Sequence, residues 1–301
     1  MCGIVGLFLK KRSLEPELGA LFSEMLICMS SRGPDSAGLA VYRTAAPPGK
    51  LKVVLQHSDS NFDWSLVAAG LERQFREKPL FDVNSSHARF LLGADVQSIR
   101  DFVEANFPAV RIMSVGHRIE IMKETGSPEA VIKRFSVRKM AGSHAIGHTR
   151  MATESAVTTD GSHPFSTGID LCLVHNGSLS NHNRLRQRLR RLGVRFYTQN
   201  DTEVAAAYFA WQLANGATLK QALHAGLSDL DGFYTFTIGT EDGFAVLRDP
   251  VACKPAVLGE TDDYVAMASE YRSLANLPGI GRARLWEPEP GVIYNWSQDA
   301  A

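Results

Sequence analysis

The second residue of the chain is a cysteine, and the apolar run Gly3–Leu9 follows it directly. A short apolar run of this kind is typical of a buried strand. The pattern therefore predicts a strand that begins immediately behind a thiol. Cys2 then has three possible roles: a structural cysteine, a lipid anchor, or a nucleophile that carries its own α-amine once Met1 has been removed.

Charge and hydropathy argue against several classes of protein. Lys plus Arg and Asp plus Glu are both 32, so no net charge favours nucleic acid or an anionic membrane. The opening apolar run has no basic region before it, which argues against a signal peptide, and no later stretch is long enough to span a bilayer. A lipid anchor on Cys2 would need an upstream cleavable signal or a juxtamembrane context. We therefore expect no membrane or nucleic-acid partner.

The remaining cysteines, Cys28, Cys172 and Cys253, lie far apart and show no zinc-type spacing. We expect free thiols, no metal site and a cytoplasmic location. His144, His148, His163 and His175 could suggest a metal, but they lack acidic partners at ligand spacing. They are better interpreted as structural histidines.

Hydrophobic periodicity predicts strands and helices in alternation. The strands expected outside the central region are 3–9, 39–42, 171–177, 233–239, 243–249 and 264–269, and the strand at 171–177 should end in an Asn-Gly turn. The helices expected there are 18–29, 183–192, one capped by Asp201 or Thr202, and one carrying leucines from 219 to 230. Arginines crowd the helix at 183–192, which is interpreted as a solvated or docking surface because leucines form its other face.

The segment 44–141 has a different pattern. It begins with the break TAAPPGK and then alternates strands (51–56, 88–94, 110–115, 118–123) with helices (64–75, 96–105, 127–135). Units of this length predict a small α/β subdomain with its own sheet.

Five short motifs occur in order along the chain: MCGIVG, SSRGPDSAG, GHTRMAT, VHNGSL and NDTEV. Each alone is weak, but together they resemble the class II glutamine amidotransferases, whose glutaminase domain uses an N-terminal nucleophile. The resemblance covers 1–43 and about 142–275. It implies an α+β fold, a four-layer αββα sandwich. It also divides the chain into a discontinuous glutamine amidotransferase domain (2–43 and 142–301) and an inserted α/β subdomain of unknown role (44–141).

The resemblance also implies roles for particular residues. Cys2 would attack the glutamine carboxamide, with its α-amine as proton acceptor. Asn176 and Gly177 would form the oxyanion hole, through a side-chain amide and a backbone N–H. The residues expected to bind glutamine are Arg32, Arg150, Thr153 and Asp201. Arg150 would grip the α-carboxylate, Asp201 would pair with the α-ammonium, and Arg32 would organise the N-terminal amine, with Gly33 allowing close backbone approach.

The motif GHTRMATES departs from the commoner GHTRWATHG, since Met151 replaces a tryptophan and Glu154-Ser155 replaces His-Gly. These changes concern the outer wall of the pocket, while Arg150 and Thr153 are kept.

The resemblance implies glutamine hydrolysis to glutamate and ammonia through a Cys2 thioester. No ammonia-consuming domain follows in the sequence, so we expect a detached amidotransferase subunit, resembling that of N-methylglutamate synthase. The chain itself would need no cofactor. Its partner would be a flavoprotein synthase subunit in a hetero-oligomer, and partner subunits would carry FMN and an iron–sulfur cluster. Two alternatives stay open: a free-standing amide hydrolase of the same fold, and a non-catalytic amino-acid-sensing subunit.

Overall fold

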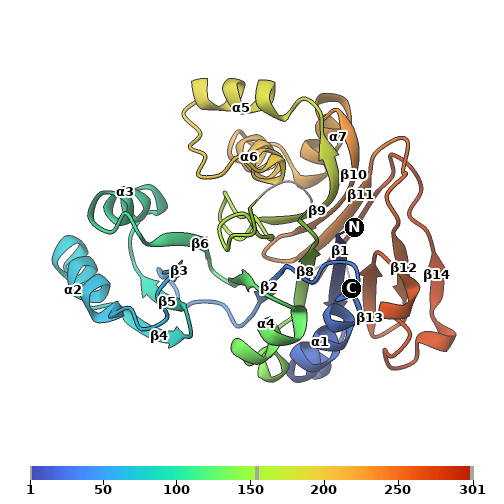
Figure 1. Cartoon of the computed structure of the whole chain (residues 1–301), viewed down its shortest axis with the longest axis horizontal. Coiled ribbons are helices and arrows are strands. Elements are labelled where there is room, and N and C mark those ends of the chain that lie inside the picture. The colour runs from blue at the N-terminus through green and yellow to red at the C-terminus, as the bar shows by residue number, and fades with distance from the viewer. Residues whose placement is uncertain (1, 153–155, 299–301) are drawn as a thin grey trace.

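The computed structural model describes residues 2–152 and 156–298. Within them, two antiparallel sheets stack at the centre of the molecule (Figure 1). The seven-stranded sheet has the order β14 (Arg284–Trp286), β12 (Val257–Glu260), β13 (Tyr264–Ala268), β1 (Gly3–Leu9), β8 (His144–Arg150), β2 (Ser36–Tyr42) and β7 (Ile119–Thr125). The four-stranded sheet has the order β15 (Ile293–Ser297), β11 (Gly243–Arg248), β10 (Gly232–Gly239) and β9 (Cys172–Leu179).

Helices cover the outer face of each sheet. The seven-stranded sheet is covered by α1 (Leu18–Cys28) and α4 (Pro128–Arg134), together with the short 3-10 turns Arg12–Glu17, Val137–Lys139, Tyr271–Ser273 and Ile280–Arg282. The four-stranded sheet is covered by α5 (His182–Arg191), α6 (Asp201–Ala214) and α7 (Leu219–Asp229). The expected four-layer α+β sandwich is confirmed.

Apolar clusters on both faces of the larger sheet explain why these layers stack. Alternate residues of a strand point to opposite faces, so β1 sends Val5 and Leu7 toward α1 and sends Ile4 and Phe8 toward the second sheet. All four side chains are buried. Because both faces of the strand are covered, its continuous apolar sequence is the pattern expected of a central strand.

A third sheet forms the left-hand lobe of Figure 1. Its strands have the order β4 (Leu80–Asn84), β5 (His87–Leu92), β3 (Leu51–Gln56) and β6 (Arg111–Gly116), with the helices α2 (Trp64–Phe75) and α3 (Val96–Asn106). This lobe has a hydrophobic core of its own. Its elements come from the first part of the segment expected to be inserted.

The second part of that segment lies elsewhere. We expected the strand 118–123 and the helix 127–135 to belong to the inserted α/β subdomain, but β7 pairs with β2 along its whole length, from Ser36–Thr125 to Tyr42–Ile119. Helix α4 packs in the core beneath the seven-stranded sheet. Sequence periodicity finds such elements but does not say which strand they pair with, and here the partner strand lies far away in the sequence.

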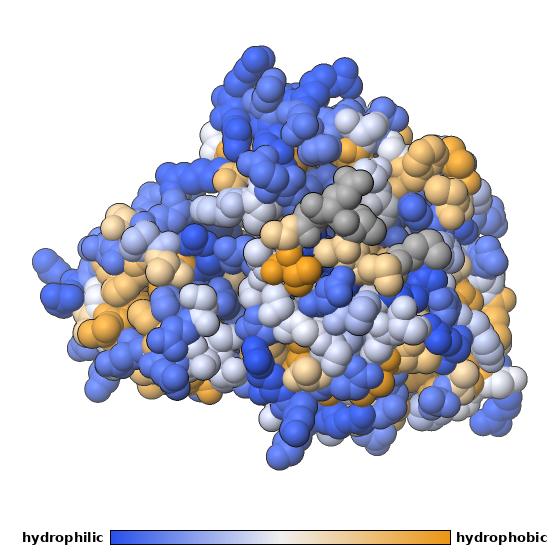
Figure 2. Space-filling view, in the orientation of Figure 1, coloured by the Kyte–Doolittle hydropathy of each residue, from blue (hydrophilic) through white to orange (hydrophobic). Residues whose placement is uncertain are grey.

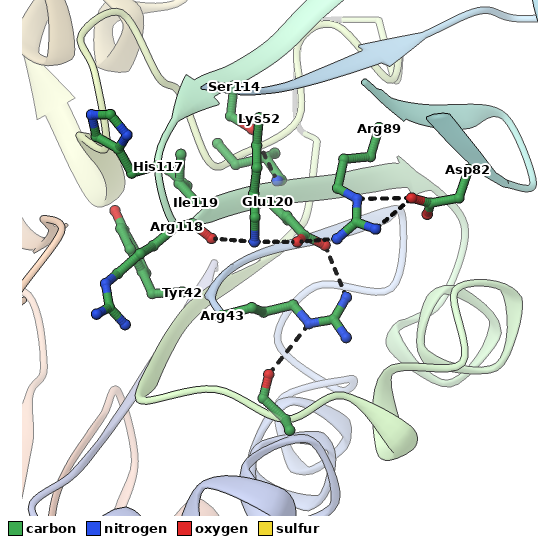
Figure 3. Close-up of polar contacts among 12 residues, drawn as sticks. Tyr42, Arg43, Lys52, Asp82, Arg89, Ser114, His117, Arg118, Ile119 and Glu120 are labelled. Atoms are coloured by element: carbon green, nitrogen blue, oxygen red, sulfur yellow. Dashed lines mark hydrogen bonds and ion pairs between the residues drawn. The ribbon is translucent and has the colours of Figure 1, made fainter. Parts of the chain in front are cut away.

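A buried ion cluster ties the lobe to the seven-stranded sheet (Figure 3). Glu120 of β7 contacts Lys52 of β3 at 2.8 Å and Arg89 of β5 at 3.0 Å, and Arg43, just after β2, reaches its second oxygen at 3.0 Å. Burial raises the pKa of Glu120, but these cations outweigh it, so the net pKa lies below the ordinary value. The carboxylate is therefore charged, and it fixes the lobe against the sheet.

Candidate active site

Cys2 lies at the start of β1, between the neighbouring strands β13 and β8 in the middle of the larger sheet. Its backbone carbonyl accepts hydrogen bonds from Arg32 Nε at 3.0 Å and from Asn176 Nδ2 at 3.4 Å. The next residues are fixed by the sheet ladder, and Ile4 N donates to Ser269 Oγ at 2.9 Å. A partly buried thiol-bearing residue is thus held on a rigid element by groups from distant parts of the chain.

Arg32 is held by a carboxylate that sequence reasoning missed. Its Nη1 lies 2.5 Å from Glu270 Oε1, and Arg272 Nε lies 2.6 Å from the other oxygen of the same carboxylate. The hydrogen bond from Arg32 lowers the pKa of Glu270 more than its slight burial raises it, and the nearby Arg272 charge adds to this. Glu270 follows β13 in the stretch VAMASEYRSL, which matches the family, but its position beside Arg32 depends on sheet pairing.

The motif SSRGPDSAG packs its turn against the end of β8. A Cβ on Gly33 would lie 2.4 Å from the backbone carbon of Thr149, so this close approach requires glycine. Asp35 then holds the strand end: its N–H donates to Arg150 O at 3.1 Å, and its carboxylate accepts from Ala152 N at 2.7 Å. Asp35 is a second supporting residue that the sequence reasoning did not single out.

Asn176 and Gly177 lie inside β9, where we expected a turn. They pair with Thr235 and Tyr234 of β10, and the strand continues to Leu179. Gly177 has φ of +147°, and a Cβ there would lie 1.8 Å from the carbonyl oxygen of Phe233. The position thus requires glycine for a backbone distortion within a paired strand, which a sequence pattern cannot distinguish from a turn.

Arg150 ends β8, and Asp201 begins α6. Arg150 Nη1 donates to Gly161 O at 3.2 Å, and Asn200 Nδ2 donates to the same carbonyl at 3.3 Å. The expected cap was wrong: Asn200 caps α6 by accepting from Thr202 N, and Asp201 instead accepts from Leu179 N at 2.9 Å. Because Leu179 ends β9, this bond ties α6 to the strand of Asn176 and Gly177. Thr153 lies outside the described residues.

Asp201 is ionised at neutral pH. Burial raises the pKa of its carboxyl, but hydrogen bonding and charge from His175, together with the Leu179 N–H, outweigh burial and bring the pKa to about 2. The carboxylate is still 22% exposed, so it remains accessible to a cationic group. Such a group could be the ammonium of an amino acid.

The buried residues His148, His163 and His175 pack together near the start of α6. Thr202 Oγ1 hydrogen-bonds to His163 Nε2 at 2.7 Å and to His175 Nδ1 at 3.0 Å, and the His148 ring stacks on that of His163 with centroids 4.0 Å apart. Burial lowers the pKa of His148 to about 3 and holds that of His163 well below its ordinary value. Across residues 2–152 and 156–298, no group of three or more His, Cys, Asp or Glu side chains is arranged to hold a metal ion.

One arginine of α5 departs from the expected solvated face. The surface over α5 is strongly hydrophilic at the top of Figure 2. Arg186, however, is buried, and donates to Gln199 Oε1 at 3.0 Å and to Asn200 O at 3.1 Å. It therefore supports the segment that leads into Asp201, a role that its arginine-rich surroundings conceal in the sequence.

None of the helices in the described part of the chain is both long and apolar enough to span a bilayer. Cys2, Cys28, Cys172 and Cys253 are all free thiols.

Comparisons with known proteins agree with the fold and with the motifs. The glutamine amidotransferase domain family matches residues 148–276. The glutamine amidotransferase-like protein GlxB of Rhizobium meliloti is 57% identical over the full length of both chains. A putative glutamine amidotransferase of Methanothermobacter thermautotrophicus is 33% identical and covers 98% of this chain and 99% of its own.

Among solved structures, the glutamine phosphoribosylpyrophosphate amidotransferase of B. subtilis superposes with a TM-score of 0.64 and 22% identity. The match covers 99% of this chain but 48% of that enzyme, so the chain spans about half of its length. This likeness confirms the fold. Taken with the full-length relatives, it shows that the chain belongs to the class II glutamine amidotransferases, the family with an N-terminal nucleophile.

Proposed function

We propose that the chain hydrolyses L-glutamine to glutamate and ammonia through a thioester on Cys2, and that the ammonia passes to a partner synthase. The observation that carries this proposal is that two distant residues donate hydrogen bonds to one backbone carbonyl. The carbonyl of Cys2 accepts from Arg32 and from Asn176, residues 30 and 174 positions away in the sequence. Asn176 is thereby held beside the proposed nucleophile, where an oxyanion would form.

The chemistry follows from the groups at this point. With Met1 removed, the α-amine of Cys2 accepts the thiol proton as sulfur attacks the carboxamide carbon. The carbonyl oxygen becomes an oxyanion, stabilised by the Asn176 amide and the Gly177 N–H. The C–N bond then breaks and the amine returns its proton to the departing ammonia. Water hydrolyses the thioester, releasing glutamate and restoring the thiol.

Glutamine would be recognised by both charges of its amino-acid end. Arg150 would bind the α-carboxylate, and the ionised Asp201 would bind the α-ammonium. Gly161 O accepts from Arg150 and from Asn200, which precedes Asp201. This shared contact would fix the spacing of the two charged groups. We extend the same role to Thr153 from its place in the GHTRMAT motif.

A diazoketone analogue of glutamine tests the proposal directly. It should alkylate Cys2 once, and peptide mass mapping should locate the adduct. L-Glutamine should protect the thiol, whereas L-asparagine, one methylene shorter, should not. Cys253 is exposed and serves as an internal control for general thiol reactivity. Equal labelling of Cys2 and Cys253, unaffected by glutamine, would refute the assignment, and protection by asparagine would favour a different amide hydrolase.

Replacing Asn176 with alanine should lower kcat for glutamine hydrolysis by about 10²–10³-fold, because one oxyanion donor is lost. KM should change little, since the donor acts mainly as charge develops. Steady-state kinetics at saturating glutamine measures this. Asn276→Ala, at an exposed position, is the matched control, and an Asn176→Ala enzyme with normal kcat would remove Asn176 from the oxyanion hole.

Replacing Asp201 with asparagine should raise KM for glutamine by about 10–100-fold, because a charged hydrogen bond to the ammonium is lost. Asparagine still offers an oxygen to Leu179 N, so the local fold should persist. Asp242→Asn, at an exposed position, is the control. A fall in kcat without a change in KM would contradict the binding role.

For the acceptor, we propose a flavoprotein synthase of the glutamate-synthase or N-methylglutamate-synthase type, with FMN and an iron–sulfur cluster in partner subunits, in the cytoplasm. This choice of acceptor rests on the resemblance of the five motifs, from MCGIVG to NDTEV, to glutaminase domains that supply ammonia to a synthase. An affinity-tagged chain, purified from its own cells, should bring down a chain with flavin absorbance near 450 nm. Recovery of a colourless acceptor enzyme instead would overturn this choice of partner.

A further inference from the structure

A cavity of about 800 Å³ lies between the inserted lobe and the main sandwich. The elements that line it are labelled in Figure 1, where β6 lies between α3 and α6. One wall comes from α3, with Val103, and from β6 and the residue before it, Val110, and the opposite wall comes from α6, with Ala207 and Trp211. None of the described candidate site residues, from Cys2 to Asp201, lines it. The cavity is therefore separate from the candidate glutamine site.

Ion pairs join the two walls at the rim. Arg195 Nη1 lies 2.7 Å from Asp101 Oδ1 and 2.9 Å from Glu104 Oε2, both on α3. Tyr197 Oη also donates to Glu104. These rim contacts are partly exposed, so each contributes little to stability, but together they link α3 to the segment that leads into α6.

The interior is mainly apolar, and the buried cation Lys123 already has its hydrogen bonds satisfied. Lys123 Nζ donates to the carbonyls of Ser162 at 2.7 Å, Asp160 at 3.2 Å and Pro164 at 3.3 Å. It also lies 4.5 Å from the centre of the Phe165 ring. An ammonium has three N–H groups, so these carbonyls use its full capacity. Lys123 shapes the wall and has no donor left for a ligand.

Two hydroxyl groups of the lining are not satisfied. Within the described residues, the oxygens of Ser166 and Thr167 are buried and have no hydrogen-bond partner. An unpaired buried hydroxyl is unfavourable, so such groups point to a polar partner that binds there. Both residues follow Phe165, and all three line the cavity.

We propose that this cavity binds a small amphipathic molecule with an apolar, ring-sized body and a hydrogen-bond-accepting end. The volume falls in the range of about 300–1,000 Å³ typical of small-molecule sites, which are mostly apolar with a few polar anchors. The body packs between Val103 of α3 and Val110, which precedes β6, on one side and the face of α6 on the other. The accepting end lies at Ser166 and Thr167, whose hydroxyls are buried in the wall and turn toward the cavity to donate to it. The ligand is not glutamine, because the cavity is mainly apolar and neither Arg150 nor Asp201 lines it.

The probe for this site is 8-anilino-1-naphthalenesulfonate, which has an aromatic body and a sulfonate that accepts hydrogen bonds. It should bind the full-length protein at one saturable site with enhanced fluorescence. L-Glutamine should not displace it. Absence of a saturable one-to-one site, or displacement by glutamine, would overturn the proposal, and neither result bears on the glutaminase assignment.

Substitutions on both walls locate the bound probe. Ala210→Trp on α6 and Val96→Trp on α3 each fill the cavity from a partly exposed position, and each should weaken probe binding at least tenfold. Leu80→Lys is the control, because Leu80 is 71% exposed on β4 and could bind the probe nonspecifically. Full affinity in both tryptophan variants, or loss of binding in Leu80→Lys, would overturn the proposal.

Discussion

Replacing Cys2 with alanine is expected to abolish glutamine-dependent activity, by about 10⁴-fold or more, because the attacking sulfur is removed. Ammonia-dependent activity of the partner synthase should remain, since ammonia needs no thiol. The glutamine-dependent activity is measured with the purified chain, as release of glutamate from glutamine. The ammonia-dependent activity is measured in the complex, as product formation with ammonium salts.

Two controls make the Cys2 result specific. Cys253→Ala removes an exposed thiol far along the chain and should leave both activities unchanged. Cys2→Ser keeps the removable Met1 and a hydroxyl nucleophile, but an oxygen of high pKa should attack far more slowly. Equal loss with glutamine and with ammonia in Cys2→Ala would mean that the substitution damages assembly, and Cys2 would then lose its proposed role.

Sequence periodicity predicted most of the strands and helices within a few residues. The strand at Gly3–Leu9 and the helices at Trp64–Phe75 and Leu18–Cys28 follow from apolar spacing alone, because each buries one stripe or both faces in a core. The sheet to which each strand belongs did not follow from apolar spacing. β7 was expected in the inserted sheet, yet it completes the edge of the larger sheet, since strand pairing depends on contacts between segments distant in sequence.

The motifs named the candidate site residues but not their supports. Arg32 and Asn176 are brought to Cys2 by the stacking of the two sheets. Glu270 contacts Arg32, and Arg186 contacts the residue before Asp201, so both support candidate site residues from behind. Neither residue type is unusual where it occurs, so the sequence does not indicate these roles. The cavity was equally hidden, because its walls come from α3, the segment 160–171 and α6.

Stability should fall steeply with pH below neutrality. His87, His144, His148 and His163 are buried, and burial lowers the pKa of each, to about 3 for the first three and well below the ordinary value for His163. Their ordinary pKa of about 6.5 returns when the chain unfolds. Stability from the neutral rings is thus complete above pH 6.5. It is lost as pH falls toward the folded-state values, because only the unfolded chain can take up these protons.

The free energy of unfolding is expected to change steeply with pH. Each histidine contributes about 1.4 kcal/mol per pH unit, so four contribute about 5 kcal/mol per unit between pH 6 and pH 4. A domain with a typical stability of about 5–15 kcal/mol should therefore unfold near pH 4–5. Urea unfolding at several pH values measures the slope directly. Asp201, with a folded-state pKa of about 2, loses its own stabilising contribution as pH falls from about 5 toward 2, so it adds little to the loss between pH 6 and pH 5.

A matched pair of substitutions separates buried from exposed histidines. His144 stacks on Tyr42 with ring centroids 4.0 Å apart and hydrogen-bonds to Thr240 O at 2.9 Å, whereas His224 is exposed on α7. His144→Gln should reduce the slope by about 1.4 kcal/mol per pH unit, the value for one proton, even if it lowers stability at pH 7. His224→Gln should leave the slope unchanged. The unfolding free energy of the wild type could instead change by only the value for one proton per pH unit, or less. These rings would then be protonated in the folded chain, and the buried histidines would not set its acid stability.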